Sequence, residues 1–296
     1  MKHKVLDLFS GIGGFSLGME KTGVFETVAF CEIEPFCHKV LKKHWQDVPI
    51  YNDIKELNYD TLQAEGIEPT VITGGFPCQD ISVAGRQEGI IGERTSLWSE
   101  YARLIEDVQP TWAIIENVPT LRSKGLVLVL QNLSEIGYNA EWHCIPCSTV
   151  GGLHRRDRIW IIAYPIEDKE TSLRGTVSES EVSHRTVSNS MCKGLEGSKQ
   201  DANHSGQSEE GNEVTSRSAS ESSGLRGEPK HIVTREQIER FAQYAKTQWT
   251  TEPKLDRVAY GIPNRVHRLK GIGNAVVPQI PQFLGESILN FEKENI

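Results

Sequence analysis

The chain has 296 residues, 38% of them hydrophobic and 24% charged, an ordinary composition for a soluble globular protein. No segment approaches the roughly 20 apolar residues that a membrane span needs, so we do not expect an integral membrane protein. The formal net charge of −8 argues mildly against a nucleic-acid partner, although the local distribution of charge decides such binding more than the sum does.

The first ten residues have a basic start and a brief apolar run that Asp7 interrupts. We expect a first strand here rather than a signal peptide, and therefore a cytoplasmic protein. Without a secretion signal, the six cysteines are expected to be reduced thiols. Cys144 and Cys147 form a CxxC pair, but no second pair accompanies them, so we expect no metal site.

Short strand-like runs alternate with helix-length segments from residue 1 to about 165. The predicted strands are residues 5–9, 27–30, 70–73, 112–116 and 158–163, and the predicted helices are residues 15–23, 35–45, 97–108 and 126–137. This alternation predicts an α/β fold with a doubly wound, mostly parallel sheet. Ligands in such sheets bind beyond the carboxyl ends of the strands.

The composition changes sharply at Pro165. Residues 166–230 are rich in serine and contain no Phe, Trp or Tyr, so they cannot bury much apolar surface. Order is expected to return at about residue 231, with a helix that Thr234 and Gln237 begin as a capping box.

This change in composition predicts three parts. Residues 1–165 would form the catalytic and cofactor-binding domain. Residues 166–257 would form a small, irregular second domain, a reduced and partly flexible target-recognition region. Residues 258–296 would return to the first domain.

Residues 7–18, DLFSGIGGFSLG, place glycines between a predicted strand and a predicted helix. Glycines in this setting let a ligand approach the backbone closely, although a tight turn alone would also explain them. Glu32 follows the second predicted strand, where a carboxylate can accept hydrogen bonds from ribose hydroxyls; the alternative is a solvated loop acid. Asp53 could accept a hydrogen bond from an adenine amino group or belong to an Asn-Asp turn.

Cys78 stands just past a predicted strand, in the sequence GGFPCQ, where a thiol would be displayed, although cysteines more often pack in the core. Glu116 ends another predicted strand. Burial there would raise its pKa and suit a general acid, while a helix-capping or ion-paired glutamate is the alternative. Arg156 and Arg158 alternate along an extended backbone, so they could bind a carbonyl or an anion from one face, or form a solvated basic face.

Taken in order, the motifs DLFSGIGGF, GGFPCQ, ENV, RRDR and GNAVVP resemble those of the cytosine-5 DNA methyltransferases. The resemblance covers about residues 3–163 and 258–292. It implies the fold of S-adenosylmethionine-dependent methyltransferases and methylation at C5 of a cytosine flipped out of double-stranded DNA. It also implies a monomer that serves either restriction–modification, with a cognate restriction endonuclease as partner, or solitary phage-type methylation.

The resemblance implies a catalytic role for four residues. Cys78 would be the nucleophile that forms a covalent adduct at cytosine C6. Glu116 would contact N3 and the exocyclic amine. Arg158 would bind the cytosine O2, with Arg156 as its partner in the motif.

The resemblance also implies the residues that hold S-adenosylmethionine. Glu32 would take the ribose, and Asp53 with Ile54 would take the adenine, while the C-terminal GNAVV segment would return to close the site. The full set is Phe9, Gly11, Ile12, Gly14, Glu32, Ile33, Asp53, Ile54, Pro77, Asn274 and Val276.

The chain departs from the family pattern before GNAVVP, where the interval that normally holds a target-recognition domain is short. That interval ends in a basic stretch that could line phosphates, with Arg257, Arg265, His267, Arg268 and Lys270. Three rival interpretations are an RNA-directed cytosine methyltransferase, a non-catalytic binding protein and a nucleotide-dependent oxidoreductase. The stretch GRQEGIIGERTSLW favours the DNA-directed form over the RNA-directed one. A non-catalytic protein would be expected to lack Cys78, Glu116 or the arginines, and all are present. An oxidoreductase leaves Pro-Cys-Gln and Glu-Asn-Val unexplained.

Overall fold

The computed structural model describes residues 2–77, 97–152, 156–166, 231–246 and 265–295. Its strands are β1 (His3–Leu8), β2 (Phe25–Cys31), β3 (Ile50–Tyr51), β4 (Val71–Gly75), β5 (Trp112–Asn117), β6 (Tyr138–Pro146) and β7 (Asp157–Pro165). Its helices are α1 (Gly14–Glu20), α2 (Pro35–His44), α3 (Tyr59–Ala64), α5 (Leu97–Val108), α6 (Leu121–Lys124), α7 (Leu126–Glu135), the 3-10 helix η3 (Cys147–Val150), α8 (Arg235–Lys246), α9 (Arg265–Asn274) and α10 (Gln279–Asn295).

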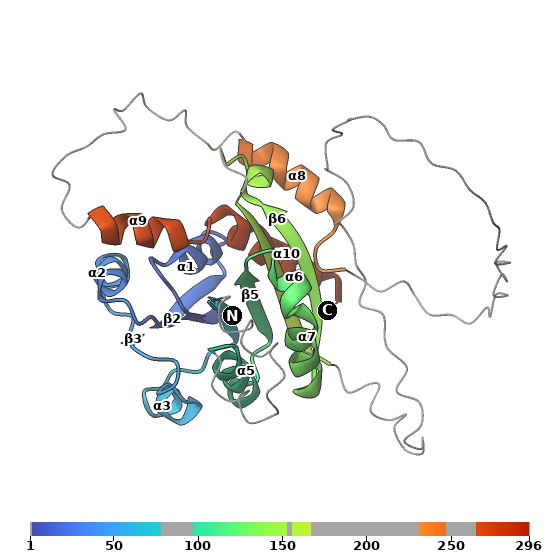
Figure 1. The fold of residues 1–296 in the computed structure, drawn as a ribbon. Helices are drawn as coiled ribbons and strands as arrows, with labels where there is room; N and C mark the ends of the chain where they lie inside the picture. The colour runs from blue at the N-terminus through green and yellow to red at the C-terminus, as the bar shows by residue number, and fades with distance from the viewer. Residues whose placement is uncertain (1, 78–96, 153–155, 167–230, 247–264, 296) are drawn as a thin grey trace, which may run out of the picture.

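The strands of the described residues form one sheet in the order β3-β2-β1-β4-β5-β7-β6 (Figure 1). The pairs from β3 to β5 are parallel, whereas β7 pairs antiparallel with both β5 and β6. The direction in which the chain adds strands reverses between β1 and β4, the kind of position where doubly wound sheets bind ligands. The predicted α/β fold with a mostly parallel sheet is confirmed.

Five predicted strands are confirmed as β1, β2, β4, β5 and β7, and the short strand β3 lies just before Asp53. Strand β6 was not predicted from the sequence. Buried and exposed residues do not alternate regularly along this strand, so the period-two signal of a half-buried strand is weak. The strand begins directly after Gly137, whose φ of 88° ends the preceding turn.

Helices cover both faces of the sheet, and each face has its own core. One core contains Leu6 and Ile115 together with side chains of α5 and α7. The other contains Val5 and Ile114 together with side chains of α1, α8 and α10. Because neighbouring strand residues point to opposite faces, adjacent residues of β1 and of β5 supply different cores.

The segment 231–246 attaches to the sheet through polar contacts and a buried apolar pair. The predicted capping box is confirmed, because Thr234 N–H donates to Gln237 Oε1 at 2.7 Å and Gln237 N–H donates to Thr234 Oγ1 at 3.2 Å. Just upstream, the N–H groups of Ile232 and Val233 donate to the Glu141 carboxylate at 3.1 and 3.0 Å. The two apolar side chains are buried in the core that α8 and α10 share.

The segment 265–295 returns to the N-terminal part of the chain. In Figure 1, α9 lies beside α2, and α10 packs against α1. A Cβ on Gly18 of α1 would stand 2.2 Å from the carbonyl oxygen of Pro278, so the glycine permits this close packing. In the parts of the chain that the structure describes, no helix has the length and apolar character to cross a membrane. Most of the predicted second domain, residues 166–257, lies outside the described residues, and the domain limits stay predictions.

Candidate functional site

The loop between β1 and α1 has the backbone conformation that its glycines favour. Gly11 and Gly13 have φ values of 55° and 83°, and Phe9 has a φ of 51°. Residues with a Cβ rarely adopt such φ angles, so glycine is the residue that fits best at positions 11 and 13. A Cβ on Gly11 would meet no atom of the other described residues within 4 Å. The loop therefore has open space for a ligand at Gly11.

Glu32 lies directly after β2 and reaches this loop. Its carboxylate oxygens accept hydrogen bonds from the N–H groups of Gly11 at 2.7 Å and Glu34 at 2.8 Å. A carboxylate oxygen has more than one lone pair, so the group can still accept from a hydroxyl. The structure brings Glu32 and the glycine loop together, and the ribose contact stays a prediction.

The C-terminal segment that follows α9 lies against the same loop. A Cβ on Gly14 would stand 2.6 Å from the carbonyl oxygen of Val276, so the two backbones are in direct contact. A Cβ on Gly271 would stand 3.3 Å from Ile12. Asn274, the last residue of α9, is exposed. The structure therefore brings the predicted residues of the glycine loop and of GNAVV into one place.

Four further residues predicted to hold the cofactor come from three segments. Ile54 is buried and Asp53 is half-buried, both just after β3. Ile33, after β2, is 60% exposed. Phe9 is half-buried and stacks on Tyr101 of α5, with ring centroids 6.3 Å apart. Exposed apolar surface of this kind suits a planar purine ring.

These residues fit a nucleoside cofactor such as S-adenosylmethionine. Open space at Gly11 allows close approach of the ligand, and the carboxylates of Glu32 and Asp53 can accept from hydroxyl and amino groups. The exposed side chain of Ile33 offers the apolar contact that a base requires. Within the described residues, no group of three or more His, Cys, Asp or Glu side chains could hold a metal ion.

Glu116, near the end of β5, forms an ion pair with Arg158 of β7, with 2.7 Å between Glu116 Oε1 and Arg158 Nε. Burial raises the pKa of Glu116, and the charges of Arg158 and Arg156 oppose that rise. The predicted upward shift of this pKa is confirmed, and the ion-paired alternative holds as well. A Cβ on Gly75 of β4 would stand 2.6 Å from Glu116 Oε2, so the carboxylate lies against the backbone of the neighbouring strand.

Asn117 holds the backbone that leads toward the predicted nucleophile. This buried side chain donates from Nδ2 to the carbonyl oxygen of Phe76 at 2.9 Å. The next residue, Pro77, is exposed. Cys78 lies outside the described residues, so its role stays a prediction. The sequence analysis identified Glu-Asn-Val as a motif but missed the positioning contact of its asparagine.

The backbone at Arg156 contradicts one expectation. Arg156 precedes β7 with a φ of 20°, so the extended backbone predicted through both arginines is wrong at this residue. Its guanidinium donates to the carbonyl oxygens of Gly273 at 2.6 Å and Ile272 at 3.4 Å. A cation is favourable at the carboxyl end of a helix, and here it binds the end of α9. The side chain therefore joins the C-terminal segment to the site, while its charge still acts on Glu116.

Trp45 supports the glycine loop, although no sequence motif pointed to it. A Cβ on Gly13 would stand 2.6 Å from the indole ring, so the ring packs directly against the loop. The indole Nε1 donates to both carboxylate oxygens of Glu20 at 3.0 Å. Trp45 and Gly13 are 32 positions apart in the sequence, and single-sequence patterns carry no signal for such a pair.

Asp7 is a fully buried acid beneath the same loop. Its oxygens accept hydrogen bonds from Ser16 Oγ at 2.8 Å and from Thr73 Oγ1 at 3.1 Å. Burial raises the pKa of Asp7 to about 7, against the lowering effect of the two hydroxyl groups. A charged residue inside an otherwise apolar strand was the signal that could have identified it.

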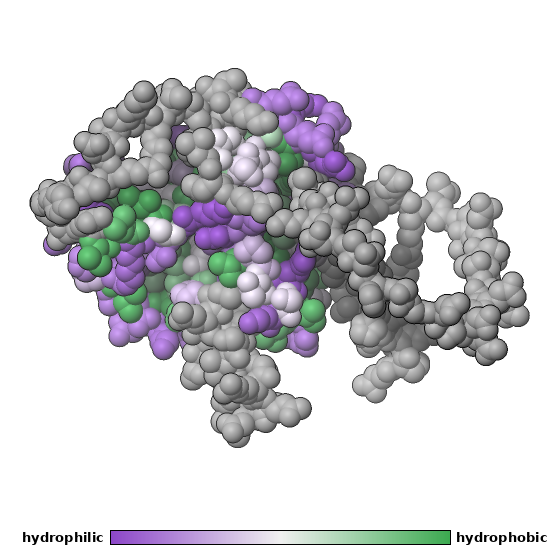
Figure 2. All heavy atoms as spheres, turned by 45° about the horizontal axis from the view of Figure 1, so that its top comes forward, coloured by the Kyte–Doolittle hydropathy of each residue, from purple (hydrophilic) through white to green (hydrophobic). Residues whose placement is uncertain are grey.

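The exposed helix α9 carries four of the five basic residues predicted to line phosphates, and the side chains of three of them are described. Lys270 pairs with Glu34, His267 stacks on the ring of Phe36 in α2, and Arg268 is exposed. Figure 2 shows hydrophilic and apolar side chains next to one another on the face turned forward. The other two predicted residues lie outside the described side chains, namely Arg257 and Arg265. The phosphate contacts stay predictions.

Comparison with known proteins supports the family suggested by these motifs. The family model for C-5 cytosine-specific DNA methylase matches residues 3–261. Type II methyltransferase M2.BsuMI of Bacillus subtilis (strain 168) is 38% identical over 173 residues, covering 56% of this chain and 43% of that protein. Type II methyltransferase M.Sau3AI of Staphylococcus aureus is 33% identical over 183 residues, covering 55% of this chain and 43% of that protein. The chain thus spans less than half the length of these curated relatives.

Solved structures show a more distant likeness. A DNMT2 variant from Spodoptera frugiperda aligns with a TM-score of 0.48 and 23% identity, over 57% of this chain and 51% of that one. The methyltransferase EhMeth of Entamoeba histolytica aligns with a TM-score of 0.46 and 17% identity, over 57% and 55% of the two chains. The family assignment rests on the family model, which covers most of the sequence. The chain belongs to the C-5 cytosine-specific DNA methylase family.

Proposed function

We propose that the protein is a DNA (cytosine-5)-methyltransferase that transfers a methyl group from S-adenosylmethionine to C5 of cytosine in double-stranded DNA. The half-buried ion pair of Glu116 and Arg158 carries the proposal, because it lies beside the end of β4, from which the chain continues to Cys78. Family membership and the names of the relatives, type II methyltransferases, support the same activity. Those names also favour a cognate restriction endonuclease as a partner.

The proposed reaction begins with addition of a nucleophile, because cytosine C5 is itself weakly nucleophilic. The Cys78 thiolate forms a bond to C6, and the ring electrons shift toward C5 and N3. Protonated Glu116 stabilises that charge at N3, and Arg158 binds O2. S-adenosylmethionine would supply the methyl group that C5 takes up, and S-adenosylhomocysteine would be the leaving group. Transfer of the C5 proton to water and cleavage of the C6–S bond then restore the cytosine ring and the thiolate.

The cofactor would lie between the glycine loop and the ends of β2 and β3. Gly11 gives room for its approach, Glu32 accepts from the ribose hydroxyls, and Asp53 accepts from the purine amine. The contact of Gly14 with Val276 keeps the C-terminal segment next to this site. These roles agree with the open space, acceptor groups and apolar surface described above.

The target base has to leave the duplex to reach a thiol beyond the end of β4. Extrusion of a base costs a few kcal/mol, on the order of the energy of one stacked pair, and contacts in the pocket would offset it. The raised pKa of Glu116 supports this arrangement, since burial makes it easier for the carboxyl group to take up the proton with which it would contact N3.

The test is methyl transfer to duplex DNA of mixed sequence, read by bisulfite sequencing. The full chain with S-adenosylmethionine should protect cytosines in a short recurring motif, and Cys78→Ala should abolish this protection. Cys192→Ala, at a cysteine outside every motif, is the matched control and should keep it. Cofactor binding without methylation of any duplex would contradict the proposal and direct the assay to RNA.

A further inference from the structure

The turn between β3 and α3 carries two residues that would contact the purine, Asp53 and Ile54. The Asp53 carbonyl oxygen accepts from the N–H groups of Glu56 at 3.1 Å and Leu57 at 3.2 Å. Asp53 Oδ1 accepts from Lys55 N–H at 3.0 Å. These bonds give the Asp53 carboxylate a fixed place within the turn, so the position of the turn decides where the carboxylate stands.

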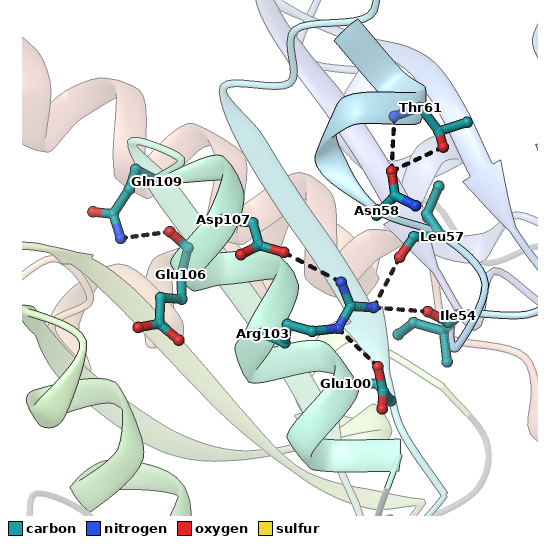
Figure 3. A network of polar contacts seen from close by, with 9 residues as sticks. All are labelled: Ile54, Leu57, Asn58, Thr61, Glu100, Arg103, Glu106, Asp107 and Gln109. Atoms are coloured by element: carbon teal, nitrogen blue, oxygen red, sulfur yellow. Dashed lines mark hydrogen bonds and ion pairs between the residues drawn. The ribbon is translucent and has the colours of Figure 1, made fainter. Parts of the chain in front are cut away.

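Arg103 of α5 binds this turn from outside. Its Nη2 donates to the carbonyl oxygens of Ile54 at 3.1 Å and Leu57 at 2.8 Å (Figure 3). These two residues also bury their side chains in the core that α5 lines. Backbone carbonyls that turn toward the interior need a donor, and a guanidinium can serve two of them at once.

The Arg103 guanidinium is itself held by two acids of the same helix. Nε pairs with Glu100 at 2.9 Å and Nη1 pairs with Asp107 at 3.2 Å, so the acids lie one turn before and one turn after it (Figure 3). A planar group bound on three sides keeps one orientation. The orientation of the Arg103 guanidinium is therefore fixed before any ligand binds.

The same helix supports a second wall of the cofactor site. Tyr101, two residues before Arg103, stacks on Phe9 of the glycine loop, with ring planes 21° apart. Thus α5 contacts both the Phe9 side and the Ile54 side of the predicted purine pocket. A displacement of α5 relative to the turn at Ile54 would change the width of that pocket.

We propose that Arg103 is a positioning residue that sets the specificity of the cofactor site for a 6-aminopurine. It fixes the carbonyls of Ile54 and Leu57, and through them the place where Asp53 accepts from the exocyclic amine. The inference rests on the proposed function, since it requires an adenine-containing cofactor at this site. Arg103 would act on the cofactor only through these carbonyl groups.

The test compares binding of S-adenosylhomocysteine and S-inosylhomocysteine, which carries an oxygen in place of the 6-amino group. The wild-type chain should prefer the adenine compound by about 10- to 100-fold, because the 6-oxygen of inosine cannot donate a hydrogen bond to the Asp53 carboxylate. Arg103→Lys keeps the positive charge, but a single ammonium group cannot bind the two backbone carbonyls and the two acids of α5 at once. We expect its preference to fall to within about threefold, measured by isothermal titration calorimetry.

Two further variants keep the test decisive. Glu100→Gln combined with Asp107→Asn leaves Arg103 in place but removes the acids that orient it, and should give an intermediate preference. Arg240→Lys is the matched control, because Arg240 forms an exposed pair with Glu236 on α8, and it should leave the preference unchanged. A global loss of stability would weaken both ligands equally and leave their ratio intact.

The outcomes separate the inference from the proposed function. If the wild-type chain binds neither compound, the proposed function fails. If the wild-type chain binds the adenine compound without preference, or if the Arg103→Lys chain and the double variant keep the wild-type preference, the inference fails while the proposed function stands.

Discussion

The two sides of the candidate site are held by different kinds of force. On the cofactor side, the glycine loop is fixed by close backbone and ring contacts, such as Gly14 against Val276 and Gly13 against Trp45. On the base side, Glu116 is fixed by charge, through Arg158. The cofactor side is therefore vulnerable to added atoms, and the base side is vulnerable to the removal of a charge.

The largest expected effect is on catalysis at the base side. Glu116→Gln keeps the shape of the side chain but cannot hold or donate a titratable proton. We expect kcat to fall about 10³-fold, or roughly 4 kcal/mol in the barrier, in the range seen when a group that stabilises the transition state is lost. Single-turnover methylation measures the effect. A cofactor Kd that rose in parallel would contradict the separation of the two sides.

Breaking the ion pair from its other partner should destabilise the fold. Arg158→Leu removes the ion-pair partner of the partly buried Glu116 and leaves Arg156 as its nearby positive charge, which costs about 3 kcal/mol of unfolding free energy at pH 8. The pKa of Glu116 is raised on folding, so the contribution of this group to stability is greatest at low pH and is lost as pH rises through the folded pKa. The deficit of the variant should therefore shrink at pH 5. Urea titration at both pH values measures it, and Glu116→Gln in the same chain should recover most of the loss.

Adding one methyl group should disrupt the cofactor side. Gly14→Ala places a Cβ against the Val276 carbonyl oxygen, and relief of this clash requires the backbone to move. We therefore expect a loss of about 2 kcal/mol in stability and weaker cofactor binding. Gly273→Ala is the control, because a Cβ there meets no described atom within 4 Å. Thermal unfolding and calorimetry measure both variants. Equal behaviour of the two chains would show that contact with Val276 is unimportant.

The smallest expected effect is on the pH dependence of stability, through the buried Asp7 carboxyl group on the cofactor side. Its pKa rises from 3.8 to about 7 on folding, so its contribution to stability is complete below pH 3.8 and is lost as pH rises through 7. Between pH 6 and 8 we expect a loss of about 1.4 kcal/mol from this group. Asp7→Asn should remove that part of the pH dependence. Identical slopes of unfolding free energy in the two chains would refute the shift.

Local signals predicted most of the fold and part of the site. The runs around Ile72 and Ile114 are apolar because both faces of the sheet are covered, and the capping box at Thr234 is complete within four residues. By contrast, Arg103 acts on a turn 46 residues or more away, and Arg156 acts on carbonyls more than 100 residues away. Such contacts depend on how the elements pack, so the sequence around either arginine carries no sign of them.

The most direct measurement of the central claim is covalent capture on DNA that contains 5-fluorocytosine. Fluorine at C5 cannot leave as a proton does, so the adduct at C6 would persist after methyl transfer. We predict a denaturant-stable complex of the full chain with mixed-sequence fluorinated duplex, formed only with S-adenosylmethionine and absent in Cys78→Ala. A chain that binds both cofactor and duplex but forms no such complex would contradict the account.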